Sequence, residues 1–113
     1  MKNKICTSIE QSKKLIELGI DVNTADMYYD CNSYSIQGKP EVVVGTVWSK
    51  DIPAWSLAAL LEVMKEPELI RNSEGKWLIR VWYHSYPYSK GDYDDPVDAC
   101  VDMIEKLHEL NVL

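Results

Sequence analysis

Apolar residues recur three or four positions apart in several parts of the chain, and this periodicity is typical of amphipathic helices. In the first part, Thr7 and Glu10 form a capping-box pattern, and Gly19 suits the left-handed residue that follows a helix. In the second part, residues 51–66, Pro53 suits a first helical turn. The pattern therefore predicts one helix between Thr7 and Gly19 and a second over 51–66.

Alternating apolar and polar residues predict strands elsewhere. Residues 27–36 have one apolar and one polar side, which favours an edge strand or a half-solvated sheet face. Residues 41–48 are apolar on both sides, which favours a central strand. Residues 68–84 contain two strand patterns around Gly75 and predict a hairpin, whereas 85–95 are predicted to form a loop.

A third helix is predicted to begin at Asp95, a capping residue followed by Pro96 at the first helical position. The expected order is α-ββ-α-ββ-α. No linker or low-complexity segment divides the chain, so we expect a single α+β domain over 1–113. Its antiparallel sheet would have about four strands, with three helices packed mainly on one face.

The net charge of the chain indicates which classes of partner it can bind. The formal net charge is −6, and the twelve basic residues are scattered. A nucleic-acid partner is not expected, because no row of basic residues could neutralise phosphates, whereas an acidic surface suits docking against a basic protein. The start lacks the apolar core of a secretory signal, and the longest apolar stretch is too short to span a bilayer. We therefore expect a cytoplasmic protein without a membrane partner.

Catalytic chemistry has little support in the sequence. There is no glycine-rich phosphate loop, no GxSxG or HExxH motif, and no cysteine pair with zinc-ligand spacing. Cys31, His84 and an aspartate could form a nucleophile with its base, but no local nucleophile signature surrounds Cys31. The aspartates of 91–98 lack the pattern of a calcium loop, and helix capping accounts for two of them. We expect no catalytic residue, metal or cofactor; the alternative is a small enzyme or ligand-binding domain with a cleft near Cys31 and His84.

Every aromatic ring in the chain carries a hydrogen-bonding tip, because there are seven tyrosines, four tryptophans and no phenylalanine. Such rings suit half-buried positions and interfaces. The predicted contact surface for a partner consists of Tyr28, Asp30, Arg80, Trp82, His84, Tyr86 and Tyr88. The alternative is that these rings pack within the fold and bond to the backbone.

The helix predicted over 51–66 has an apolar arc wider than one face of a surface helix requires. Burial between two layers of the fold explains this arc, and contact with a second copy in a homodimer is the alternative. The residues of that oligomer face would be Trp55, Leu57, Leu61 and Met64.

Three stretches resemble a known family: SIEQSKKLIELGIDVNTADMYY, IPAWSLAALLEVM and DDPVDACVDMIEKLHELNVL. They are similar, over nearly the whole chain, to short uncharacterised proteins from gut bacteria of the Bacteroides type and their phages. The resemblance implies a phage or prophage origin and a small α+β fold, and it brings no functional residue with it. We therefore expect a non-catalytic protein-interaction module that binds a protein partner or itself. Inhibition of a host nucleic-acid enzyme is one form of this function, and it requires carboxylates clustered on one face in place of phosphates.

Overall fold

Three helices and six strands make up the part of the chain that the structure, a computed structural model, describes: residues 4–34, 40–45 and 51–113. The helices are α1 (Ile9–Glu17), α2 (Leu57–Val63) and α3 (Pro96–Glu109), with a short 3-10 helix, η1 (Val22–Thr24), after α1. The strands are β1 (Met27–Tyr34), β2 (Pro40–Val44), β3 (Ile52–Ala54), β4 (Glu68–Arg71), β5 (Trp77–Tyr83) and β6 (Tyr86–Tyr93). The order is α-βββ-α-βββ-α, so each half has one strand more than predicted.

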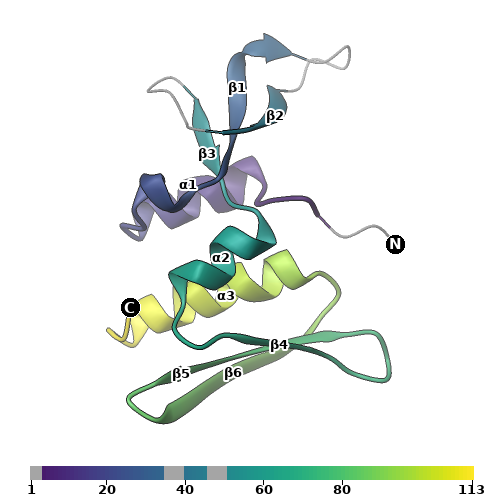
Figure 1. The fold of residues 1–113 in the computed structure, drawn as a ribbon, viewed down its shortest axis with the longest axis vertical. Coiled ribbons are helices and arrows are strands. Elements are labelled where there is room, and N and C mark those ends of the chain that lie inside the picture. The colour runs from purple at the N-terminus through teal and green to yellow at the C-terminus, as the bar shows by residue number, and fades with distance from the viewer. Residues whose placement is uncertain (1–3, 35–39, 46–50) are drawn as a thin grey trace.

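The strands form two antiparallel sheets of three strands, and the prediction of a single sheet with about four strands is wrong. The first sheet has the order β2-β1-β3, and the second has the order β4-β5-β6. The three helices lie between the two sheets (Figure 1). The α+β class is confirmed, but the helices form a middle layer with a sheet on each side.

The edge position considered for the first strand and the central position predicted for the second are both wrong, whereas the half-solvated alternative for the first strand is not contradicted. β1 pairs with β2 on one side and with β3 on the other, so β1 is central although its polar residues favoured an edge. β2 lies at an edge of the described sheet, and Val44 on it is 76% exposed. Apolar residues on both sides of β2 therefore do not reflect burial on both sides. Residues 46–48 of the predicted strand lie outside the described residues.

Helix α1 begins at a capping box one residue later than predicted. Ser8 Oγ accepts a hydrogen bond from the Gln11 N–H (3.1 Å), and the Ser8 N–H donates to Gln11 Oε1 (3.0 Å). The helix ends as predicted, because Gly19 has a φ of +88° and the Ile20 N–H donates to the Leu15 carbonyl (3.1 Å). These contacts form a Schellman motif, which only a residue tolerant of positive φ completes without strain.

The segment before α2 is a strand, where the sequence predicted the first helical turn. Pro53 lies on the edge strand β3 opposite Tyr28, and a proline is tolerated there because one side of an edge strand needs no N–H donor. Helix α2 begins instead after Ser56, whose Oγ accepts from the Ala59 N–H (3.2 Å). Ser56 also donates its hydroxyl and its N–H to the Asp26 carboxylate.

Residues 86–93 form the strand β6, where the sequence predicted a loop. Tyr83 pairs with Tyr86, and the two residues between them, His84 and Ser85, have φ values of +52° and +64°. Two positive φ angles in a two-residue connection are typical of a type I′ hairpin turn. Pairing with β5 therefore imposes a strand on a segment whose own composition favours turns.

The main core lies between the helices and the inner face of the second sheet, which we define as the face that α3 covers. Its fully buried side chains include Trp55, Leu15, Leu60, Ile79, Met103, Ile104 and Leu107. Helix α3 packs against β5 and β6, and α2 packs against α3. A smaller core beneath the first sheet contains Cys6, Met27 and Ala54, with Tyr29 packed against them.

Buried polar contacts join the first sheet to the helical layer. The Thr7 N–H donates to the Trp55 carbonyl (2.9 Å), and the Trp55 N–H donates to Thr7 Oγ1 (3.0 Å). The indole Nε1–H of Trp55 donates to Thr24 Oγ1 (2.9 Å). These bonds satisfy the donors of a tryptophan that is 0% exposed, as burial requires.

Asp95 connects the N-terminal segment to the start of α3. Asp95 Oδ1 accepts from the Val97 N–H (2.8 Å), which caps the helix as predicted. Asp95 Oδ2 accepts from the Lys4 N–H (2.7 Å), and Lys4 Nζ forms an ion pair with Asp98 (2.7 Å). One carboxylate thus begins a helix and fixes a segment ninety-one positions away in the sequence.

Candidate functional site

The predicted oligomer face lies largely inside the molecule. Trp55 and Met64 are 0% and 5% exposed, and both belong to the main core. Leu57 and Leu61 are half-buried and pack against the same core. Burial between layers therefore explains the wide apolar arc, and Trp55 and Met64 cannot form a face for a second copy.

The predicted contact surface is divided between the two sheets. Tyr28 and Asp30 lie on β1 in the first sheet. Arg80 and Trp82 lie on β5 in the second sheet, and His84 lies in the turn that follows β5. The helical layer separates the two groups (Figure 1), so these residues do not form one surface.

Within the second sheet, the remaining predicted residues lie on opposite faces. Tyr88 pairs with Val81, a buried core residue, so Tyr88 belongs to the inner face. Tyr86 lies on the same side and contacts Tyr88, with ring centroids 4.8 Å apart. Arg80 and Trp82 alternate with the core residues of β5 and therefore lie on the outer face.

Glu68 fixes the orientation of two of these side chains. Its carboxylate accepts hydrogen bonds from Arg80 Nη2 (2.7 Å) and from the indole Nε1–H of Trp82 (2.7 Å). The Arg80 guanidinium carbon lies 6.0 Å from the centre of the Trp82 ring. The hydrogen bonds from Arg80 and then from Trp82 lower the pKa of Glu68 below its usual value of 4.5. We call these three residues the Glu68 cluster.

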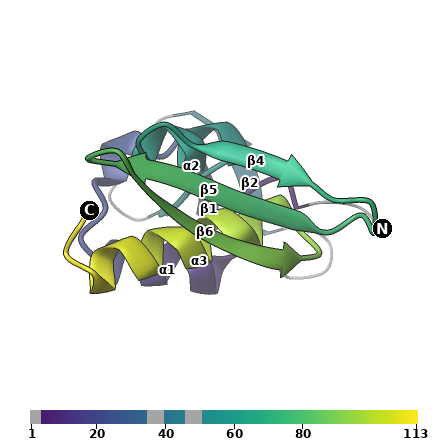
Figure 2. The ribbon, with the colours of Figure 1, turned by 90° about the horizontal axis from the view of Figure 1, so that it is seen from below.

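Aliphatic side chains lie beside the Glu68 cluster on the outer face. Ile70 on β4 pairs with Leu78 on β5, and both follow the same alternation as Glu68 and Arg80. Ile70 is 39% exposed and Leu78 is half-buried. Figure 2 shows this face from below, and no helix lies in front of β4 or β5. Aromatic and arginine side chains among aliphatic ones are typical of the centres of protein interfaces.

Sequence reasoning identified Arg80 and Trp82 but missed Glu68 and Ile70. The hairpin pattern of 68–84 could have indicated a pairing of Glu68 with Arg80, because opposite charges directly across two strands attract each other. Using it required the register of the hairpin, in which Glu68 is opposite Arg80. That register depends on how many residues the turn around Gly75 takes up, which the pattern alone did not specify.

The alternative cleft near Cys31 and His84 has no counterpart in the described residues. The backbone of Cys31 lies in the first sheet and His84 follows β5 in the second, although the side chain of Cys31 is outside the description. Two other thiols are buried: burial raises the pKa of Cys6, and it raises the pKa of Cys100 to about 12. Neither Cys6 nor Cys100 is therefore an activated nucleophile at neutral pH.

Acidic side chains follow one side of α3, where they recur at helical spacing: Asp98, Asp102, Glu105 and Glu109. Lysines lie among them. Lys4 pairs with Asp98 (2.7 Å), and Lys14 lies 3.8 Å from Glu105. This side of α3 therefore carries mixed charge, whereas mimicry of a nucleic acid requires a continuous set of free carboxylates.

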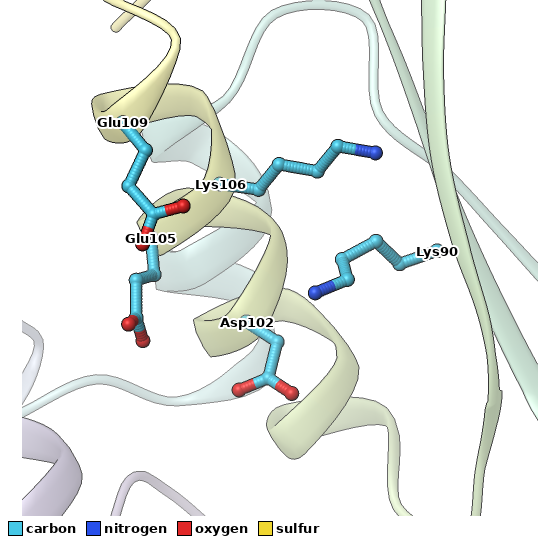
Figure 3. Close-up of a pocket in the computed structure, with 5 residues that line it drawn as sticks. All are labelled: Lys90, Asp102, Glu105, Lys106 and Glu109. Carbon is cyan, nitrogen blue, oxygen red and sulfur yellow. The ribbon is translucent and has the colours of Figure 1, made fainter.

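The hollows on the surface of the described residues include two that are lined by charged or thiol side chains. One, of about 500 Å³, lies between β6 and α3 and is lined by Lys90, Asp102, Glu105, Lys106 and Glu109 (Figure 3). We call it the charged hollow. The other, of about 280 Å³, lies beside Cys6, Tyr29 and Val42, near the first sheet.

Neither a cluster of metal-ligating side chains nor a membrane-spanning helix is found in the described part of the chain. Among the described residues, no group of three or more His, Cys, Asp or Glu side chains is arranged to hold a metal ion. Within residues 4–34, 40–45 and 51–113, no helix has both the length and the apolar character to cross a bilayer.

These elements define the class of the molecule: an α+β protein with a helical layer between two three-stranded antiparallel sheets. Comparisons of the chain with protein-family models, with curated proteins and with solved structures found no match.

Proposed function

We propose that this chain is a non-catalytic protein-interaction module of the cytoplasm, and that a protein partner docks on the outer face of the second sheet. The phage or prophage setting of this proposal comes from the sequence resemblance. The observation that supports it best is the Glu68 cluster, in which one carboxylate holds an arginine and a tryptophan side by side on an uncovered face.

The fixed geometry of the Glu68 cluster favours binding for an entropic reason. Ordering a rotamer-rich side chain at an interface costs about 0.5–1.5 kcal/mol. Glu68 already restrains Arg80 and Trp82 in the free protein. Binding of a partner therefore does not incur the entropic cost of ordering these two side chains. Tryptophan and arginine are also the residue types that dominate binding energy at interfaces.

The charges of the molecule indicate the chemistry of the partner. Glu68 and Arg80 neutralise each other at the centre of the outer face, and Ile70 and Leu78 beside them are aliphatic. The partner should therefore present an apolar patch to this face. The net charge of −6 favours a partner with basic residues around that patch, because long-range attraction speeds the encounter.

Affinity capture from a lysate of a Bacteroides-type bacterium tests the proposal. Trp82→Ala should reduce the recovery of a specific partner about ten-fold or more, since loss of a central interface anchor costs at least about 2 kcal/mol. Glu68→Gln should reduce it less, because the ring and guanidinium remain but lose their charged acceptor. Circular dichroism of each variant checks that the fold is intact.

Tyr86→Ala is the matched control, because Tyr86 is 60% exposed and lies on the same sheet but on its inner side. It should leave the recovery of the partner unchanged. Equal recovery with wild type and Trp82→Ala would refute the outer face as the docking site. Equal loss with Tyr86→Ala would show a general effect of removing exposed rings.

A further inference from the structure

The charged hollow contains a lysine where the fold would place an apolar residue. Lys90 on β6 pairs with Ile79, which is 0% exposed on the inner face of the second sheet. Lys90 therefore projects from the inner face toward α3 (Figure 3). Its neighbours on that face are core residues such as Val81 and Tyr88.

A second lysine reaches into the same space from the helix. Lys106 extends from α3 toward the strands, and Asp102 lies one turn earlier on the helix, on the side nearer Lys90 (Figure 3). Neither lysine forms an ion pair with a carboxylate of the described residues. Two ammonium groups therefore enter one hollow without a fixed counter-charge.

Three carboxylates, all of them on α3, also line the hollow. Burial and then the neighbouring Asp102 carboxylate raise the pKa of Tyr93. Glu105 and Glu109 project from the side of α3 away from Lys90 and form the rim (Figure 3). Lysines and carboxylates thus line one space of about 500 Å³, a size that small-molecule sites commonly have, and Asp102 is the carboxylate nearest Lys90 (Figure 3).

This arrangement selects among ligand charges. A polyanion held by the two lysines would meet the Asp102 carboxylate, and a simple cation would meet the two lysines. A ligand with adjacent negative and positive groups pairs with both the lysines and Asp102. We propose that the charged hollow binds a free α-amino acid, with its carboxylate between Lys90 and Lys106 and its ammonium group at Asp102.

Lys90 has a competing structural role. An inward-pointing charge on an edge strand can prevent pairing with another chain, and β6 is an edge strand of the second sheet. A lysine that serves only this role needs no ligand, so its replacement would cause self-association without affecting any binding. The experiment therefore measures both properties.

The test is a titration of ¹⁵N-labelled protein with an equimolar mixture of the standard free amino acids, followed by single amino acids from that mixture. Saturable NMR shifts are expected at backbone amides of 88–93 and 99–109. N-acetyl amino-acid amides, which lack both charges, should produce no such shifts. Lys90→Met and Lys106→Met should each weaken binding about ten-fold or more, because each removes one charge-assisted contact and keeps most of the side-chain volume.

Lys13→Met is the matched control, since Lys13 is exposed on α1, outside the hollow. It should bind as the wild type does. The proposal is overturned if no saturable shift occurs, if the N-acetyl amides shift the same amides equally, or if inorganic phosphate binds as well as the amino acids. It is also overturned if Lys90→Met self-associates in ultracentrifugation while amino-acid binding is absent from the wild type.

Discussion

At the scale of single residues, Glu68 has the most direct effect on the candidate docking face. Its carboxylate is the shared acceptor of Arg80 and Trp82, so its charge state determines whether the cluster keeps its geometry. The pKa of Glu68 is lowered in the folded protein. The favourable interaction is therefore complete above the usual value of 4.5 and is lost as the pH falls through the lowered folded value.

This titration can be followed at Trp82. The indole N–H resonance of Trp82 should move as Glu68 becomes protonated, with a midpoint below pH 4.5. In Glu68→Gln, the same resonance should show no such transition, because the amide does not titrate. A midpoint at or above 4.5 in the wild type would mean that Arg80 and Trp82 do not stabilise the carboxylate in solution.

At the scale of elements, the connection between β5 and β6 is a source of backbone strain. His84 and Ser85 both have positive φ, a region that costs an ordinary residue roughly 1–2 kcal/mol. Asn-Gly is the pair best suited to a type I′ turn. The double variant His84→Asn, Ser85→Gly should therefore raise the free energy of unfolding by about 1 kcal/mol, measured by urea denaturation.

Gly75, in the turn between β4 and β5, provides the converse control. Its φ is +81°, so Gly75→Ala should lower the free energy of unfolding by roughly 1 kcal/mol. A loss of stability in the His84→Asn, Ser85→Gly variant would contradict the turn assigned here. It would mean that the natural side chains contribute more than the strain costs.

Local signals predicted the C-terminal end of α1 and the start of α3 better than the start of α2 or the strands. The cap at Asp95 and the left-handed Gly19 depend on contacts within a few residues, and both are confirmed. β3 pairs with the distant β1, and β6 pairs with β5 across a two-residue turn. This pairing overrides Pro53 in β3 and a turn-rich composition in β6. The same limit applies to the site, because Arg80 and Trp82 were found by composition, but their separation from Tyr28 depends on the two-sheet topology.

At the scale of the whole molecule, the two sheets pack against hydrophobic cores of very different size. The first sheet covers Cys6, Met27 and Ala54, whereas the second shares the main core with residues from all three helices. Local opening depends on how much apolar contact a region buries. We therefore expect amides of β1 to exchange with solvent about ten-fold or more faster than those of β5.

Hydrogen exchange followed by NMR measures this difference. Met27→Ala should accelerate exchange in the first sheet and leave Ile79 and Val81 in β5 unchanged, because Met27 belongs to the smaller core alone. Equal exchange rates in the two sheets of the wild type would show that the molecule opens as one cooperative unit.

The attachment of Lys4 to Asp95 has a consequence for biosynthesis. A ribosome makes the N-terminal segment first, yet the carboxylate that holds it is made ninety-one residues later. Helix α3, which lies between the sheets, follows Asp95. The main core cannot close before residues up to Leu107 have left the exit tunnel. The nascent chain therefore exposes the apolar faces of both earlier helices until α3 has emerged, and the packing of the main core is a late, nearly simultaneous event.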